Sequence, residues 1–412
     1  MKELSKLIKR EINKPSPIRE IMKMAEPKNI INLGLNPDEV ISFGGGWVNH
    51  ASPEELRKSY ADIINDIKSF HNSGGYSPTL GFDETRESIV KFSKILFNEN
   101  INKENIIVGG SSTQLTIDLL RILLDPNDTI ILPDPTYANY YGQISFISES
   151  IKIKNVPFLD PEWKFLSNKK EILKDIQELM LNKKTKAMLI ASPDNPTSQI
   201  IPHDFMVDLL KISQDTGTYL IIDYAYKTQY FEDNYPAYFS YTPLNFENLI
   251  TINSNSKWGR GLGRRLGWLE GNEEIIGAME RAQQVSILCP DTLHQMAFNN
   301  FMKSGVNLRA YVDNVRKDYK KAGEITIKAI NEYLGYRYLI PQGGLYVPME
   351  VGEDSNNFVI NVLKNTGVIF VPGKGFGKSM EKGVRISYGP LVNDLDKIIT
   401  GISKVGKYVH GK

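Results

Sequence analysis

From residue 104 onward, the chain alternates between continuous hydrophobic runs and segments whose apolar residues recur every three or four positions. The runs are rich in Ile, Val and Leu, which is typical of strands that helices cover on both faces. We expect strands at 105–110, 128–137, 185–197, 218–226 and 248–257, the second and third of them running into turns. The periodic segments predict helices at 112–124 and 203–217.

Strands that alternate with helices in this way predict a mostly parallel sheet with helices on both faces. A longer helical pattern, 307–335, leads into strands expected at 344–351, 367–373 and 383–389. These strands indicate a second, smaller α/β unit. We divide the chain into an N-terminal segment packing with the small domain, a large domain and a small C-terminal domain, at 1–42, 43–305 and 306–412.

Polar side chains gather where the predicted strands end. They are Ser111–Gln114, Tyr137, Asn195, Asp223–Tyr226 and Lys257. A parallel sheet brings the carboxyl ends of its strands to one edge, where the ligands of open α/β sheets bind. We therefore expect five separate segments to meet at one cleft.

The stretch "SNSKWGRGLGRRLGW", 254–268, holds a lysine, three arginines, four glycines and no acid. A solvated basic surface usually carries acids as well, so this composition favours an anion bound by close backbone approach. If the stretch is extended, the neighbours Arg264 and Arg265 face opposite sides, and only one of them reaches the anion.

Composition narrows the partners of the protein. The 412 residues carry a net charge of +1, so nothing global points to nucleic acid or a membrane surface. One cysteine and five scattered histidines favour neither a disulfide framework nor a metal site. The N-terminus lacks the apolar core of a signal peptide, and no apolar run is long enough to span a bilayer. We expect a cytoplasmic protein without a metal.

In their order from Gly44 to Arg385, these segments resemble the fold type I pyridoxal 5′-phosphate (PLP) enzymes, specifically the class I and II aminotransferases. The resemblance implies the PLP-dependent transferase fold, an α/β fold with a mostly parallel sheet of the seven-stranded type and a smaller α/β C-terminal domain. The spacing K-x-x-x-x-x-G-x-R-x-G-W is most similar to the alliinase and tryptophan aminotransferase-related branch.

The resemblance implies that Lys257 forms the internal aldimine with PLP and then moves the substrate α-proton. A free lysine amine, with a pKa of roughly 10.4, is protonated, and burial beside other cations is what makes it reactive. Asp223 matches the aspartate that keeps the pyridine nitrogen protonated. Tyr226 and Asn195 match contacts to the ring 3′-oxygen, although Ser198 replaces the glycine of the family's N-P-T-G motif.

The remaining cofactor contacts also follow from the resemblance. The expected contacts to the phosphate or the ring are Ser111, Ser112, Thr113, Tyr137, Ser254 and Arg265. Tyr137 matches the aromatic residue that stacks on the pyridine ring. The hydroxyl residues at 111–113 equally fit ordinary helix N-capping. Arg264 is the rival of Arg265, and Arg260 has no assigned role.

Substrate contacts are implied as well. Arg385 matches the arginine that binds the α-carboxylate of an amino acid or 2-oxo acid, and Gly45 and Asn195 complete the substrate side. A large apolar pocket is one alternative for the side chain, lined by residues from 47–50, Tyr140, Tyr141 and Trp258. The other alternative is a second carboxylate held by Arg260 or Arg264.

Tyr76, in "YSPTLGFDETR", matches a tyrosine that reaches the cofactor phosphate of a neighbouring subunit. The resemblance therefore implies a homodimer with shared active sites.

The function that follows is a PLP-dependent aminotransferase with a ping-pong mechanism. A carbon–sulfur lyase on the same scaffold is the alternative. A non-catalytic PLP-binding regulator fits less well, because regulators of this kind carry an added N-terminal DNA-binding domain, and few residues precede Gly44. An oxidoreductase that binds a dinucleotide is weaker still, because no G-x-G-x-x-G follows a first strand.

Overall fold

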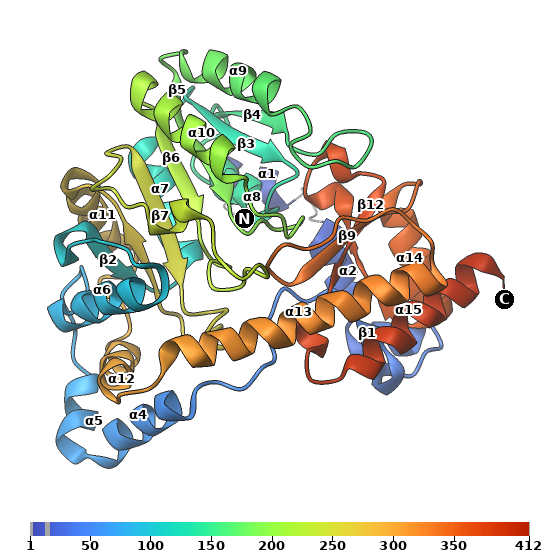
Figure 1. Cartoon of the computed structure of the whole chain (residues 1–412), viewed down its shortest axis with the longest axis horizontal. Coiled ribbons are helices and arrows are strands. Elements are labelled where there is room, and N and C mark those ends of the chain that lie inside the picture. The colour runs from blue at the N-terminus through green and yellow to red at the C-terminus, as the bar shows by residue number, and fades with distance from the viewer. Residues whose placement is uncertain (1–2, 13–16, 412) are drawn as a thin grey trace.

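The computed structural model describes residues 3–12 and 17–411. A large α/β unit lies at one end and a smaller unit at the other, and the long helix α13 (Leu308–Tyr333) runs between them (Figure 1).

The large unit is built on a seven-stranded sheet. In the order in which they pair, its strands are β2 (Ile106–Gly109), β8 (Gly267–Glu270), β7 (Leu249–Ser254), β6 (Tyr219–Asp223), β5 (Thr185–Ala191), β3 (Thr129–Asp134) and β4 (Lys152–Pro157). All neighbours are parallel except at β8, which is antiparallel to both β2 and β7. The expected mostly parallel sheet is confirmed.

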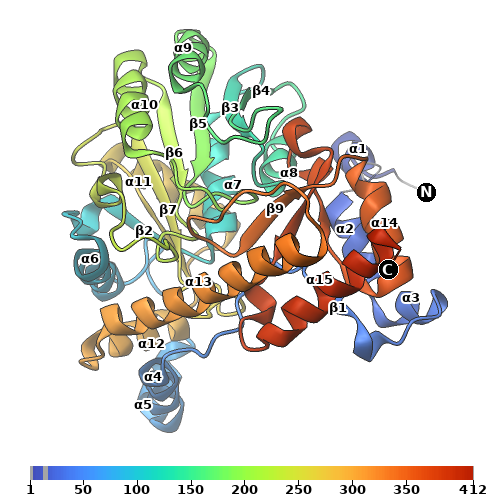
Figure 2. The same cartoon turned by 45° about the vertical axis from the view of Figure 1, so that its right-hand side comes forward.

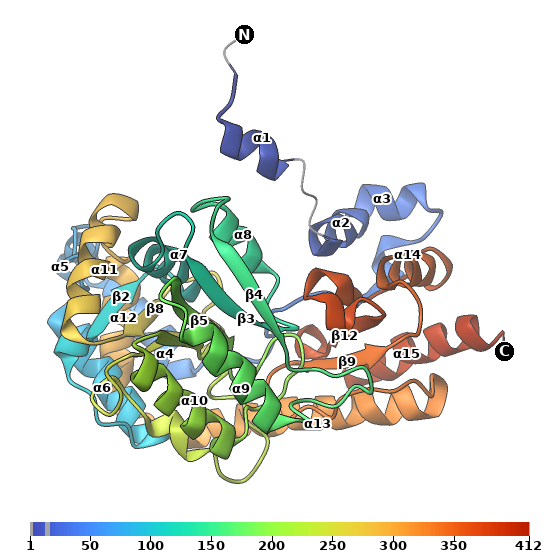
Figure 3. The same cartoon turned by 90° about the horizontal axis from the view of Figure 1, so that it is seen from above.

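Helices cover both faces of this sheet (Figure 3). They are α6 (Asp83–Phe97), α7 (Ser112–Leu123), α8 (Asn139–Ser145), α9 (Lys169–Met180), α10 (His203–Thr216), α11 (Glu273–Ser286) and α12 (Thr292–Lys303). Alternate strand residues enter different cores, because successive side chains of a strand point to opposite faces. Ile130 belongs to the core that also holds residues of α7, α8 and α11, whereas Ile131 belongs to the core that also holds residues of α6, α9, α10 and α12.

The smaller unit combines two short sheets with helices. Strands β11 (Val371–Pro372), β12 (Gly383–Ser387) and β9 (Tyr346–Glu350) are antiparallel, and β1 (Ile41–Ser42) and β10 (Val368–Ile369) form a parallel pair. The helices are α2 (Pro17–Met24), α3 (Pro27–Asn32), α14 (Ser355–Thr366) and α15 (Leu395–His410). The single strand expected at 367–373 is therefore wrong. It divides at Phe370 because β10 pairs with β1 and β11 pairs with β12.

The N-terminal helix α2 lies beside α14, and α3 lies next to α2 (Figure 2). Ile21, Ile41 and Phe43 share one hydrophobic core with Val384 and Ile402. The expected domain boundaries themselves stay a prediction.

The remaining elements are short or peripheral. The remaining α-helices are α1 (Lys6–Ile12), α4 (Glu54–Asn65) and α5 (Ile67–Ser73). The 3₁₀ turns are η1 (Pro37–Glu39), η2 (Lys103–Asn105), η3 (Ala237–Ser240), η4 (Gly373–Gly375), η5 (Lys378–Met380) and η6 (Gly389–Leu391). Within the described ranges, no helix is long and apolar enough to cross a membrane.

A buried glycine joins the N-terminal segment to the last helix. A Cβ at Gly401 of α15 would lie 2.6 Å from the ring of Phe43 and 3.0 Å from Ile41. We expect Gly401→Ala to lower the free energy of unfolding by about 1–3 kcal/mol through overpacking. Gly277 in α11 has no atom within 4 Å of such a Cβ, so Gly277→Ala is the control and should stabilise by about 0.5–1 kcal/mol. Urea unfolding midpoints measure both, and equal shifts would contradict this packing.

Candidate active site

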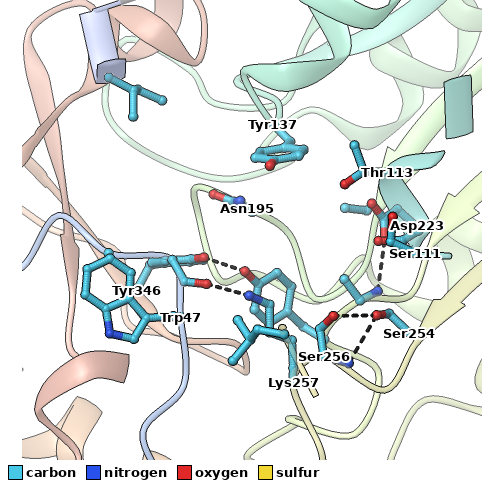
Figure 4. Close-up of a pocket in the computed structure, with 18 of the residues that line it drawn as sticks. Trp47, Ser111, Thr113, Tyr137, Asn195, Asp223, Ser254, Ser256, Lys257 and Tyr346 are labelled. Carbon is cyan, nitrogen blue, oxygen red and sulfur yellow. Dashed lines mark hydrogen bonds between the residues drawn. The ribbon is translucent and has the colours of Figure 1, made fainter. Parts of the chain in front are cut away.

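A cavity of about 330 Å³ lies at the carboxyl edge of the large sheet and is closed by residues of the smaller unit and of α2. It brings together every expected site residue except Tyr76: Gly45, Ser111, Ser112, Thr113, Tyr137, Asn195, Asp223, Tyr226, Ser254, Lys257, Arg265 and Arg385. Figure 4 shows Asp223, Ser111 and Thr113 on one side, Trp47 and Tyr346 on the other, and Lys257 and Asn195 between them.

Lys257 follows β7, and its amine donates a hydrogen bond to the carbonyl of Gly46. Burial lowers the pKa of this amine to about 8, and the nearby guanidinium groups of Arg385 and Arg265 act in the same direction. Asp223 opposes them. A larger fraction of the amine is therefore neutral, and able to act as a nucleophile and base, than in a free lysine at the same pH.

Asp223 is the last residue of β6 and is 8% exposed. Its carboxylate accepts the hydroxyl of Tyr140 at 2.8 Å and the N–H of Ala225 at 2.9 Å. Burial raises the pKa of Asp223, and these two donors partly offset that rise. A buried carboxylate in this state gains most from a cationic partner, such as a protonated ring nitrogen.

The first turn of α7 borders the same cavity. The hydroxyl of Ser111 accepts the N–H of Gln114 at 3.2 Å, so Ser111 is the helix N-cap. Ser112 and Thr113 follow it in the turn whose N–H groups have no partner within the helix. Gly267 permits close packing here, since a Cβ at that position would lie 2.9 Å from the Ser112 nitrogen. This end of α7 has the features of an anion site.

The neighbours Arg264 and Arg265 separate, although not for the reason expected. Arg265 has a φ of +52°, so the expectation of an extended stretch is wrong. Arg265 lines the cavity, and its guanidinium donates to the Leu262 carbonyl at 2.8 Å. Arg264 lies instead over the ring of Tyr60, at 5.2 Å, and Arg260 donates to Asn49 at 2.9 Å.

On the other side of the cavity, Arg385 of β12 is 4% exposed. It donates to Asn195 at 2.9 Å and to the Gly44 carbonyl at 3.2 Å, and its Nε has no hydrogen-bond partner. Its guanidinium lies 4.2 Å from the ring centre of Tyr346. A fixed guanidinium with an unused donor suits a planar carboxylate.

Ser254 and Tyr137 occupy opposite parts of the cavity wall. The hydroxyl of Ser254 accepts the N–H of Ser256 at 3.1 Å and thereby shapes the turn before Lys257. Tyr137 stands edge-on to Tyr140, with ring centres 5.3 Å apart. Its ring lines the open part of the cavity (Figure 4).

Tyr76 lies outside the cavity. It is 85% exposed and lies in the chain shortly after α5 (Ile67–Ser73). The structure therefore does not bring Tyr76 to the site of its own chain.

Sequence reasoning missed several residues that line the cavity. Tyr346 is one of them, and its hydroxyl is hydrogen-bonded to that of Tyr226. Ile18 and Met22 of α2 and Leu262 are further examples. Tyr346 follows a Gly-Gly pair at the start of an expected strand, and that aromatic residue was an available signal.

The cavity lining distinguishes the two alternatives for binding the substrate side chain, an apolar pocket or an arginine. Trp47 and Tyr140 line the cavity, whereas Arg260 and Arg264 do not. Trp258 packs in the large core against Phe92 and other aromatic rings, so its expected place in the pocket is wrong. Tyr141 lines a neighbouring hollow instead.

Ser198, which replaces the glycine of N-P-T-G, keeps a glycine-like conformation with a φ of +56°. Its hydroxyl accepts the N–H of Tyr346 at 3.0 Å. Its carbonyl accepts the N–H of Gln342 at 2.9 Å. The substitution thus ties the Asn195 turn to the strand that carries Tyr346.

Comparison with known proteins gives a consistent result. Residues 38–402 match the family model described as aminotransferase class I and II. An aspartate aminotransferase of Pyrococcus horikoshii is 26% identical over 397 residues, which cover 95% of this chain and 96% of that protein. An aromatic-amino-acid aminotransferase of Thermococcus litoralis is 27% identical over 395 residues, covering 94% and 97%.

Solved structures share the fold. A single mutant of Thermus thermophilus aspartate aminotransferase superposes with a TM-score of 0.85 at 24% identity, covering 98% of this chain and all of that chain. The expected PLP-dependent transferase fold is confirmed.

The donor set of the cavity fits PLP. A buried amine, a buried carboxylate, a helix N-terminus and Arg265 match the aldehyde, ring nitrogen and phosphate of that cofactor. The described residues hold no group of three or more His, Cys, Asp or Glu side chains placed to bind a metal. The match over residues 38–402 shows that the chain belongs to the class I and II aminotransferases and is a PLP-dependent transaminase.

Proposed function

We propose that the cavity around Lys257 is the active site in which the chain moves an amino group from an amino acid to a 2-oxo acid. The observation that carries this proposal is the buried amine of Lys257, whose pKa lies at about 8 beside two arginines. In this proposal Lys257 binds the cofactor covalently. Its Nζ would take the proton from the α-carbon of the amino donor and, in the second half-reaction, would deliver a proton to the α-carbon of the newly formed amino acid.

The large unit would hold the cofactor. Its phosphate would be bound by Ser111, Ser112, Thr113, Ser254 and Arg265, and Asp223 would pair with its ring nitrogen. Tyr226 and Asn195 would contact its ring oxygen, and Tyr137 would lie against its ring. When bound, PLP supplies an electron sink that stabilises the negative charge left by the α-proton.

The smaller unit holds the substrate. Arg385 binds the α-carboxylate shared by amino acids and 2-oxo acids, and the hydrogen bond to Asn195 fixes its orientation. Gly45 also lines the cavity, and the Gly45 carbonyl accepts a hydrogen bond from the hydroxyl of Ser387. Since both half-reactions use this one carboxylate contact, the amino donor and the oxo-acid acceptor bind in turn.

The enzyme is a homodimer with shared sites in this proposal. Tyr76 is exposed, and apolar side chains with large exposed fractions lie on the neighbouring α5 and at the end of α11: Ile67 at 88%, Phe70 at 56% and Val285 at 89%. A surface of this kind is typical of an interaction site. Tyr76 then reaches the cofactor phosphate of the partner subunit.

The proposed location is the cytoplasm. The single cysteine, Cys289, offers no disulfide framework of the kind that oxidising compartments favour.

Lys257→Ala tests the central assignment. We expect transamination of any amino acid with 2-oxoglutarate to fall by more than about 10²–10⁴-fold, because proton transfer at the α-carbon loses its base. Steady-state assays of glutamate formation measure this loss. The reaction without an acceptor is the control, since a lyase releases pyruvate and ammonia without one. Substantial residual transamination in Lys257→Ala would contradict the assignment of Lys257 as the base.

The two adjacent arginines form a matched pair for the phosphate contact. Arg265→Lys keeps the charge but removes the bidentate fork. We expect its PLP dissociation constant to rise about tenfold to a hundredfold, the equivalent of roughly 1.5–3 kcal/mol. Arg264→Lys, which faces Tyr60, should change it little. Titration of PLP into both apo variants decides between them, and the opposite ranking would place the phosphate contact on Arg264.

Tyr76→Phe should weaken PLP binding by about 0.5–1.5 kcal/mol, or up to about 3 if its phosphate contact is charge-assisted.

Sedimentation should show a dimer at micromolar concentration. Dimers mixed from Tyr76→Ala and Lys257→Ala chains should regain part of the activity, because one site then has both residues. A fully active monomer would contradict the shared site.

A further inference from the structure

The proposed cofactor contacts leave one side of the cavity unused. Asp223, Ser111 and Thr113 lie together, and Trp47 and Tyr346 face them across Lys257 and Asn195 (Figure 4). If the proposed function is correct, the first side holds the cofactor. The side chain of the amino acid must then lie toward Trp47 and Tyr346.

Three consecutive glycines shape this second side. A Cβ at Gly44 would lie 3.2 Å from the Met22 sulfur, and one at Gly46 would lie 3.1 Å from the Tyr346 hydroxyl. At Gly45 it would overlap the ring of Trp47, at 2.2 Å. Each glycine therefore lets one large side chain approach the backbone of 44–46.

Ile18 and Met22 add an apolar wall from α2, and Leu262 adds another apolar side chain to the lining. Trp47 lines the cavity and is 40% exposed, so part of this large residue is uncovered. An aromatic ring that is only partly covered in a cavity is available to bury an apolar ligand group.

The described residues of this chain bring no cation to this side of the cavity beyond those that already have a task. Among the residues that the structure describes, the cations that line the cavity are Lys257, Arg265 and Arg385, and each already has a proposed task. Arg19, on α2, lines the neighbouring hollow together with Tyr137 and Tyr141. Next to Trp47 and Met22, a second substrate carboxylate would lose water, and the described lining residues of this chain offer it no cation beyond those three, which makes its burial costly.

We infer that the amino donor carries a bulky apolar side chain and no second carboxylate, and that Trp47, Met22 and Ile18 bind that side chain. The inference rests on the proposed function and adds its substrate class. It differs from what the name aspartate aminotransferase says of the relatives in Pyrococcus and Thermus.

The first experiment compares donors with the holoenzyme. Single-turnover conversion of leucine, methionine, phenylalanine, aspartate and glutamate is followed by the absorbance of the cofactor. We expect kcat/KM for the best apolar donor to exceed that for both acidic donors by roughly tenfold or more. A preference for aspartate or glutamate overturns the inference and leaves transamination at this cavity standing. Failure of all five donors contradicts the proposed function, and the inference is rejected with it.

The second experiment measures binding without turnover. The unreactive acids 4-methylpentanoate and succinate each offer Arg385 one carboxylate, but only succinate brings a second. Calorimetry on the holoenzyme should show tighter binding of 4-methylpentanoate, and tighter binding of succinate overturns the inference.

Variants then locate the contact. Trp47→Ala and Met22→Ala should each lower kcat/KM for leucine roughly tenfold, mainly through KM, and change that for alanine little. Lys23→Ala is the matched control on the same helix, because its side chain is exposed and does not line the cavity. Equal losses for leucine and alanine in Trp47→Ala would indicate a general structural defect and reject Trp47 as the specificity contact.

Discussion

Burial of the Lys257 amine beside two guanidinium groups sets the condition that the rest of the site must meet. Desolvation and the charges of Arg385 and Arg265 lower the pKa of Lys257 to about 8, and Asp223 pulls it the other way. A fully exposed lysine would stay protonated, and an unpaired buried cation would destabilise the fold. The two structural units must therefore meet around this amine, since Arg265 and Arg385 come from different units.

Both arginines are held by the backbone. Arg265 adopts a left-handed conformation, which costs a non-glycine residue of order 1–3 kcal/mol and persists only where the surroundings enforce it. Arg385 is fixed by Asn195 and the Gly44 carbonyl. Ser198, also left-handed, binds the N–H of Tyr346, the residue stacked on Arg385. Local strain on the large unit thus helps to place a guanidinium on the small one.

Much of this arrangement is visible in the sequence, because local signals carry it. The buried runs predict β2, β3, β5, β6 and β7. Asp223 and Lys257 lie at or shortly after the ends of these strands, and that position marks them as candidate site residues. Strand β8 gives little local signal, since its four residues pair with β2, far away in sequence. Edge strand β4 alternates with exposed lysines and looks polar. The φ of Arg265 depends on tertiary contacts, and no residue pattern marks it.

The second side of the cavity shows why long-range contacts escape a sequence pattern most easily. "GGG" at 44–46 looks like a flexible turn, yet each glycine closely approaches a different residue: Met22, Trp47 or Tyr346. Met22 comes from a helix, Trp47 directly follows the three glycines, and Tyr346 comes from a strand some three hundred positions later. The carbonyl groups of the same three glycines accept hydrogen bonds from Lys257, Arg385 and Ser387. One run of backbone therefore orients the amine and the carboxylate-binding arginine, while its lack of side chains makes room for the apolar wall. Under the proposed substrate class, reactivity and selectivity depend on the same three residues, so a side chain added there would disturb both together.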